Sequence, residues 1–136
     1  MNSKKTILLV EDDQVDVMTV KRAFKELRIL NPLECASNGE EALDYLRDPS
    51  KSLPCIILLD LNMPKMNGLE FLSVAKNDEQ LKKVPVIVMT TSHDEQDKVE
   101  SFNYSVAGYV VKPVEFDNFV AAVKTIDLYW TLSEQL

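Results

Sequence analysis

Four short apolar runs in this sequence each end at side chains that suit phosphate or a hard cation such as Mg²⁺. In chain order these side chains belong to Glu11-Asp12-Asp13, Asp60, Thr90-Thr91 and Lys112-Pro113. In an open α/β sheet, ligands bind outside the carboxyl ends of the parallel strands. If the four runs are parallel strands of one sheet, we expect all four groups to meet along a single edge and form a site.

The carboxylates of Glu11, Asp12 and Asp60 are the strongest candidates for that site. Like charges held close together raise one another's pKa, so such a cluster stays ionised only beside compensating cations. Mg²⁺ prefers hard oxygen ligands, keeps several waters and takes few protein ligands. The alternative is that residues 11–13 are an acidic helix N-terminus favoured by the helix dipole, and Asp13 is expected to act only as a cap.

Asp60, Lys112 and Thr90 each have an ordinary interpretation when taken singly. A carboxylate at the tip of a buried strand is unfavourable unless it is used or paired, although an aspartate often begins a turn. A lysine suits a phosphate or carboxylate oxygen, but most lysines lie in exposed loops. The bond between Lys112 and Pro113 can be cis, which would turn the lysine toward the sheet edge. Thr90 either offers a hydroxyl there or is simply a β-branched residue that ends a strand.

Three other residue types receive ordinary interpretations from the sequence alone. Tyr109 is expected to be a packing residue with its hydroxyl in water. His93, the sole histidine, is assigned no role. Cys35 and Cys55 are expected to be buried reduced thiols, because no metal-ligand spacing connects them.

The elements that must position these residues alternate between short apolar runs and longer amphipathic segments. This alternation is typical of βα units around a parallel sheet, and solidly apolar runs indicate strands covered on both faces. We expect strands near 6–10, 33–36, 55–59, 86–90 and 108–111. We expect helices near 14–28, 39–47, 68–76, 95–103 and 115–131.

Length and composition favour one domain. The chain has 136 residues and a formal charge of −7, without a Lys/Arg cluster that would indicate nucleic-acid binding. The sequence shows neither a signal peptide nor a stretch long enough to span a membrane, so we expect a cytoplasmic protein. The βα units fill residues 1–136, which leaves no separate output domain in the expected organisation.

The ordered set of motifs resembles the receiver domain of two-component response regulators. The motifs are Leu9-Val10-Glu11-Asp12-Asp13, Asp60…Met63-Pro64…Gly68, Thr90 and Gly108-Tyr109-Val110-Val111-Lys112-Pro113. In finer detail, residues 86–92, residues 112–114 and Tyr129-Trp130 are similar to single-domain regulators of the phytochrome-associated type. The first resemblance covers essentially the whole chain and is more specific than any of its parts.

The resemblance implies a flavodoxin-like (βα)5 fold with strand order 2-1-3-4-5 and a phosphorelay role. Asp60 would be the phosphoacceptor, and Lys112 and Thr90 would hold phosphoryl oxygens. Mg²⁺ would be held by the side chains of Glu11, Asp12 and Asp60 and by the backbone carbonyl of Asn62. Thr90 and Tyr109 would form a switch.

The implied partners are a sensor histidine kinase, such as a phytochrome, and a second copy of the chain. The second copy would bind through the surface of the fourth helix, fifth strand and fifth helix. Phe119, Tyr129 and Trp130 either form an exposed aromatic contact for such a dimer or are buried under a C-terminal turn.

Three other functions remain as alternatives. A Mg²⁺-dependent phosphohydrolase would need a second carboxylate two residues after the nucleophile, where this chain has Asn62. An adaptor independent of phosphorylation would not need the complete set of site residues. A flavin-binding module fits poorly, because the acidic loop 11–14 lacks the glycines or hydroxyls that cradle phosphate. We therefore expect a phosphoacceptor that catalyses only its own phosphorylation and dephosphorylation, rather than an enzyme.

Overall fold

A five-stranded parallel sheet with the order β2-β1-β3-β4-β5 forms the centre of the molecule. The computed structural model describes residues 5–63, 65–91, 93–112, 115–122 and 124. The strands are β1 (Ile7–Val10), β2 (Leu33–Ala36), β3 (Ile56–Asp60), β4 (Val86–Thr90) and β5 (Gly108–Val111). The helices are α1 (Gln14–Glu26), α2 (Gly39–Arg47), α3 (Gly68–Lys76) and α4 (His93–Ser101), and residues 116–122 are also helical. The flavodoxin-like strand order expected from the resemblance is confirmed.

The expected elements agree with the observed ones to within two residues at each described end, and the structure adds one short helix. Helix α4 begins at His93, two residues earlier than expected, and a short 3₁₀ helix, η1 (Leu81–Lys83), was not expected. The expected segment 115–131 is helical over 116–122, and its end lies outside the described residues. The proposed cis bond involves Pro113, which also lies outside them.

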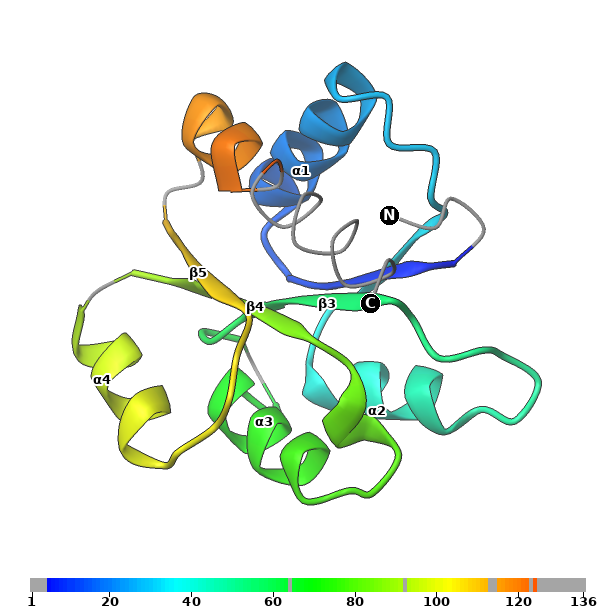
Figure 1. The fold of residues 1–136 in the computed structure, drawn as a ribbon, viewed down its shortest axis with the longest axis vertical. Coiled ribbons are helices and arrows are strands. Elements are labelled where there is room, and N and C mark those ends of the chain that lie inside the picture. The colour runs from blue at the N-terminus through cyan, green and yellow to red at the C-terminus, as the bar shows by residue number, and fades with distance from the viewer. Residues whose placement is uncertain (1–4, 64, 92, 113–114, 123, 125–136) are drawn as a thin grey trace, which may run out of the picture.

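Helices cover both faces of the sheet, as Figure 1 shows. Helix α1 and residues 116–122 lie on one face, and α2, α3 and α4 lie on the other. Every residue of β1, β3 and β4 is buried, which explains why these runs are apolar without alternation. None of the helices in the described part of the chain combines the length and apolar character of a membrane span.

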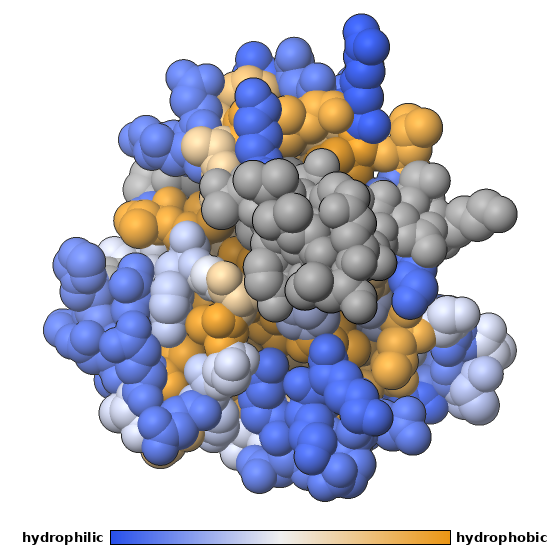
Figure 2. Space-filling model, in the orientation of Figure 1, coloured by the Kyte–Doolittle hydropathy of each residue, from blue (hydrophilic) through white to orange (hydrophobic). Residues whose placement is uncertain are grey.

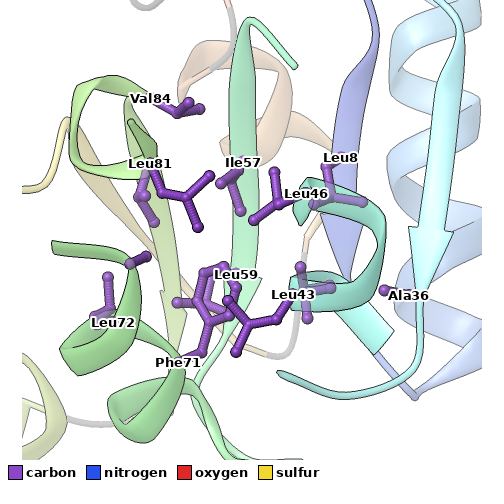
Figure 3. Packing of buried hydrophobic residues seen from close by; sticks show 14 of the residues in the cluster. Leu8, Ala36, Leu43, Leu46, Ile57, Leu59, Phe71, Leu72, Leu81 and Val84 are labelled. Atoms are coloured by element: carbon purple, nitrogen blue, oxygen red, sulfur yellow. The ribbon is translucent and has the colours of Figure 1, made fainter. Parts of the chain in front are cut away.

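Two hydrophobic clusters fill the space between the layers. Figure 3 shows the larger one, in which Leu59 of β3 packs with Leu43 of α2 and with Phe71 of α3. The second cluster joins α1 to residues 116–122, with 6.0 Å between the ring centroids of Phe24 and Phe119. In Figure 2, hydrophobic residues are visible in patches between hydrophilic ones on the face shown.

The second cluster shows whether Phe119 is an exposed aromatic contact or a buried one. Phe119 is 1% exposed and belongs to the core, so the interpretation of this side chain as an exposed dimer contact is wrong. Its ring is covered because residues 116–122 pack on α1 through the side chain of Phe24. Tyr129 and Trp130 lie outside the described residues.

The expectation of buried thiols is also wrong for Cys35, which is exposed. Cys35 lies in β2, and β2 is an edge strand whose two central residues are exposed. Cys55 precedes β3 and is half-buried, and both cysteines are free.

The turn after β3 is held by local contacts that place Asp60. The Asn67 side chain accepts a hydrogen bond from the Glu70 N–H, and the Glu70 side chain accepts one from the Asn67 N–H, which forms a capping box for α3. Gly68 follows, and its backbone lies directly against that of Asp60. A Cβ atom on Gly68 would lie 2.6 Å from the Asp60 carbonyl oxygen and 2.6 Å from Leu61 Cα.

We predict that Gly68→Ala destabilises the protein, because both close atoms belong to backbone that must shift to admit a methyl group. The expected loss in the free energy of unfolding is about 1–3 kcal/mol, measured by urea denaturation. Gly108→Ala is the matched control, because a Cβ at Gly108 meets nothing within 4 Å. Equal stability of the two variants would contradict this description of the turn.

Candidate functional site

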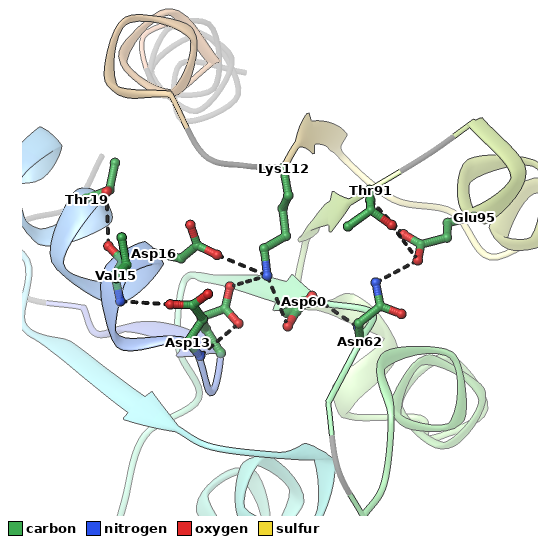
Figure 4. Close-up of polar contacts among 10 residues, drawn as sticks. Asp13, Val15, Asp16, Thr19, Asp60, Asn62, Thr91, Glu95 and Lys112 are labelled. Carbon is green, nitrogen blue, oxygen red and sulfur yellow. Dashed lines mark hydrogen bonds and ion pairs between the residues drawn. The ribbon is translucent and has the colours of Figure 1, made fainter.

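The structure brings the predicted site residues to one edge of the sheet. Glu11 follows β1, Asp60 ends β3, Thr90 ends β4 and Lys112 follows β5. The first three are buried, with exposed fractions of 1%, 0% and 0%. Figure 4 shows Lys112 and Asp60 pointing toward each other from different strands.

The Lys112 ammonium group is shared by three carboxylates. Its Nζ atom lies 2.9 Å from Glu11 Oε1, 3.1 Å from Asp16 Oδ2 and 3.3 Å from Asp60 Oδ2. The Lys112 N–H also donates to the Thr90 carbonyl oxygen at 2.6 Å, which fixes the end of β5 against β4. Glu11 Oε1 and Asp60 Oδ2 are buried, and this ammonium group is their charge partner.

Asp16 is a member of this cluster that the sequence analysis missed. It lies in the first turn of α1 and is 6% exposed. Its signal in the sequence is an acidic residue within one turn of the cap Asp13, and the apolar stripe of the same segment does not reveal it. Asp13 itself is confirmed as the cap of α1, because its Oδ1 atom accepts a hydrogen bond from the Val15 N–H at 2.9 Å.

The charges of this cluster depend on one another. Burial raises the pKa of the Glu11 carboxyl to about 8, with a further contribution from Asp60, while Lys112 opposes the rise. Burial alone would lower the pKa of Lys112, but the hydrogen bonds to Glu11 and Asp16 and the charge of Asp60 raise it above its usual range. The lysine therefore stays charged, and the carboxylates depend on it for compensation.

The same edge offers a set of oxygen atoms that fits a divalent cation. Glu11, Asp12 and Asp60 each supply a carboxylate oxygen, and these atoms lie within 4.8 Å of one another. Asp12 is exposed, so the set opens to solvent on one side. Asn62 lies beside it, because the Asn62 N–H donates to Asp60 Oδ1 at 3.1 Å. An all-oxygen, anionic set of this kind suits hard cations such as Mg²⁺ or Mn²⁺.

A second polar group, which the sequence analysis also missed, lies beside Asp60. The Glu95 carboxylate accepts hydrogen bonds from Asn62 Nδ2 at 2.6 Å and from the Thr91 N–H at 2.8 Å. Gln96 Nε2 donates to the Thr90 hydroxyl at 3.4 Å. Both Glu95 and Gln96 come from the first turn of α4, where the sequence carries no apolar pattern that would have revealed them.

The other two residues considered from the sequence lie near this edge in ordinary environments. Tyr109 is half-buried in β5, opposite Val88 of β4, and burial raises the pKa of its hydroxyl. His93 is exposed at the start of α4. Neither residue makes a contact that would assign it a catalytic role within the described part of the site.

The fold is that of a response regulator receiver domain. The family model for that domain matches residues 7–124, and the chain belongs to this family. It is a signalling domain of two-component systems. The superfamily expected from the ordered motifs is therefore confirmed.

Two curated relatives resemble the chain over most of its length. The probable methanogenesis regulatory protein FilR2 of Methanothrix harundinacea is 40% identical over 127 residues, which is 91% of this chain and 82% of FilR2. The response regulator Rcp1 of Synechocystis is 35% identical over 133 residues, which is 95% of this chain and 90% of Rcp1.

Solved structures of phytochrome-associated regulators are similar as well. The bacteriophytochrome response regulator RtBRR matches with a TM-score of 0.81 and 42% identity, over 89% of this chain and 76% of that chain. The phosphorylated cyanobacterial phytochrome response regulator RcpA matches with 0.79 and 35%, over 94% of both chains. The Mn²⁺-bound form of Rcp1 matches with 0.78 and 35%, over 93% and 94%. The relation to phytochrome-associated regulators is confirmed.

We predict that Lys112→Met destabilises the protein most strongly at alkaline pH. The variant keeps the apolar stem but leaves the carboxylates of Glu11, Asp16 and Asp60 buried without their cation. The expected loss in the free energy of unfolding is about 3–5 kcal/mol at pH 8. At pH 5 the loss is smaller, because the Glu11 carboxyl, with its pKa of about 8, is then protonated and needs less compensation.

Denaturation of both proteins at the two pH values, without divalent cations, measures this effect. Lys98→Met is the control, because Lys98 is an exposed lysine of α4. If Lys112→Met matches the wild type at pH 8, the compensating role of the lysine is wrong.

Proposed function

We propose that the protein accepts a phosphoryl group from a sensor histidine kinase onto Asp60 in a reaction that needs Mg²⁺. One observation carries the proposal: Asp60 is fully buried in a cluster that contains both a lysine and two further carboxylates. A carboxylate in this setting is costly for folding, which favours a use in chemistry. Two similar proteins support the proposal: the structure of RcpA is that of a phosphorylated regulator, and the structure of Rcp1 is that of its Mn²⁺-bound form.

In the proposed reaction, an Asp60 carboxylate oxygen attacks the phosphorus of a phosphohistidine. A P–O bond forms, the P–N bond breaks, and the imidazole leaves with its electron pair. Glu11, the side chains of Asp12 and Asp60 and the Asn62 carbonyl oxygen would hold the Mg²⁺. When bound, the cation would neutralise charge that otherwise keeps carboxylate and phosphoryl apart. Positioning and electrostatic stabilisation then supply most of the catalysis.

Lys112 and Thr90 would receive the phosphoryl oxygens. The Lys112 ammonium group already lies 3.3 Å from Asp60 Oδ2, and a phosphoryl group on Asp60 would take over part of its charge pairing. The Thr90 hydroxyl would lose its hydrogen bond with Gln96 and would instead bind a second phosphoryl oxygen. Water then attacks the aspartyl phosphate and resets the signal, so the domain would catalyse only its own phosphorylation and dephosphorylation. Asn62 has an amide at the position where a phosphohydrolase needs a general acid.

The output would be a change in a protein-binding surface. Movement of Thr90 would favour an inward position of Tyr109 and shift a pre-existing equilibrium of the surface formed by α4, β5 and the helix that begins at residue 116. We propose a cytoplasmic phosphorelay with a phytochrome-type kinase as donor, supported by the similarity to RtBRR and RcpA. A second copy of the chain is the partner proposed for the switched surface.

We predict one phosphoryl group on the wild-type protein after incubation with acetyl phosphate and Mg²⁺. Intact-protein mass spectrometry measures the gain, and hydroxylamine should remove it because an acyl phosphate is labile. Asp60→Asn and chelation of Mg²⁺ should each abolish the gain. Asp44→Asn, which removes an exposed carboxylate of α2, should leave it unchanged. Stable labelling of Asp60→Asn would refute the assignment.

A further inference from the structure

Glu95 connects the two loops that border Asp60 on the side of α4. Its Oε1 atom accepts hydrogen bonds from Asn62 Nδ2 at 2.6 Å and from the Thr91 hydroxyl at 3.0 Å. Its Oε2 atom accepts one from the Thr91 N–H at 2.8 Å. Asn62 follows β3 and Thr91 follows β4, so a single side chain bridges the loops after both strands, as Figure 4 shows.

The bridge is held by an ionised carboxylate. Burial opposes ionisation of Glu95, but the hydrogen bonds from Thr91 and Asn62, together with the charge of Lys112, outweigh it and lower the pKa of this carboxyl. Hydrogen bonds to an ionised acceptor are stronger than those between neutral groups. The three hydrogen bonds of the bridge all end on this one side chain.

The loop after β4 is the one that must move if Thr90 is to bind a phosphoryl oxygen. Thr91 is the next residue, and its backbone N–H and its hydroxyl both bind Glu95. Thr90 is itself held by Gln96, the neighbour of Glu95 in the first turn of α4. Val99 is the buried residue of α4, so much of the attachment of this helix near the site is polar.

We propose that Glu95 is a positioning residue that holds the loops after β3 and β4 in the unphosphorylated arrangement. This inference rests on the proposed function, because it assigns Glu95 to the phosphorylation equilibrium of Asp60. Phosphoryl entry draws Thr90 toward Asp60 and must loosen the contacts between Glu95 and Thr91. Part of the free energy of phosphoryl binding must then be used to break the contacts of Glu95. Glu95 thereby shifts the equilibrium between the two arrangements.

The proposal predicts two effects of opposite sign when the bridge is removed. The unphosphorylated protein loses hydrogen bonds and becomes less stable. Its affinity for beryllofluoride, which mimics the phosphoryl group on an aspartate, increases because the bridge no longer has to open. We expect an increase of about tenfold for Glu95→Ala, which corresponds to about 1.4 kcal/mol. Glu95→Gln keeps the shape and one acceptor, and we expect a smaller increase.

The experiment titrates beryllofluoride, with Mg²⁺ present, into the wild type and both variants, and follows amide NMR signals. The same spectra show that each variant is folded, and chemical denaturation without ligand gives its stability. Asp94→Ala is the matched control, because Asp94 is an exposed acid in the same first turn and shares any effect of the helix dipole. We expect its beryllofluoride affinity to equal that of the wild type.

Each outcome decides something different. Lower stability together with higher affinity in Glu95→Ala supports the proposal. Lower stability with unchanged or reduced affinity overturns it, because Glu95 would then support the fold without restraining the switch. An equal rise in Asp94→Ala also overturns it, because the effect would then be one of charge alone. If the wild type fails to bind beryllofluoride, the proposed function itself is wrong, and the role of Glu95 is withdrawn with it.

Discussion

The shared contact of the Lys112 ammonium group with Glu11, Asp16 and Asp60 is the interaction on which the site depends. Three buried carboxylates repel one another and lose hydration, and each effect favours protonation or unfolding. One lysine, which follows β5, offsets both effects because its ammonium group contacts all three side chains. The site is therefore held together by an electrostatic balance that a divalent cation or a phosphoryl group can shift.

The parallel sheet makes this balance possible because it brings distant residues to one edge. Hydrophobic packing on both faces fixes the positions of β1, β3 and β4. The carboxyl ends of these strands then determine where Glu11, Asp60 and Thr90 lie at the sheet edge. The turn after β3 adds a second constraint, since Gly68 lets the start of α3 lie against the Asp60 backbone. The apolar core consequently positions the sheet edge, and the sheet edge carries the polar groups of the site.

The strands and the polar groups that end them could be predicted from the sequence because both are local patterns. The strand order and the roles of the site residues came only from the resemblance to receiver domains. The sequence did not reveal Asp16, Glu95 or the exposure of Cys35, for reasons that are not local. Asp16 is buried because Lys112, almost a hundred residues away, reaches it. Glu95 depends on where two loops meet, and Cys35 depends on β2 being an edge strand. A compensating cation was expected in general terms, and the structure assigns part of that role to Lys112.

A crystal structure of the protein with Mg²⁺ and beryllofluoride tests the central claim most directly. The account predicts beryllium bonded to an Asp60 carboxylate oxygen, with fluorine atoms facing the Lys112 ammonium group and the Thr90 hydroxyl. It also predicts the cation on Glu11, Asp12, Asp60 and the Asn62 carbonyl oxygen. Density for the mimic at any other residue, with Asp60 still paired only to Lys112, would contradict the account.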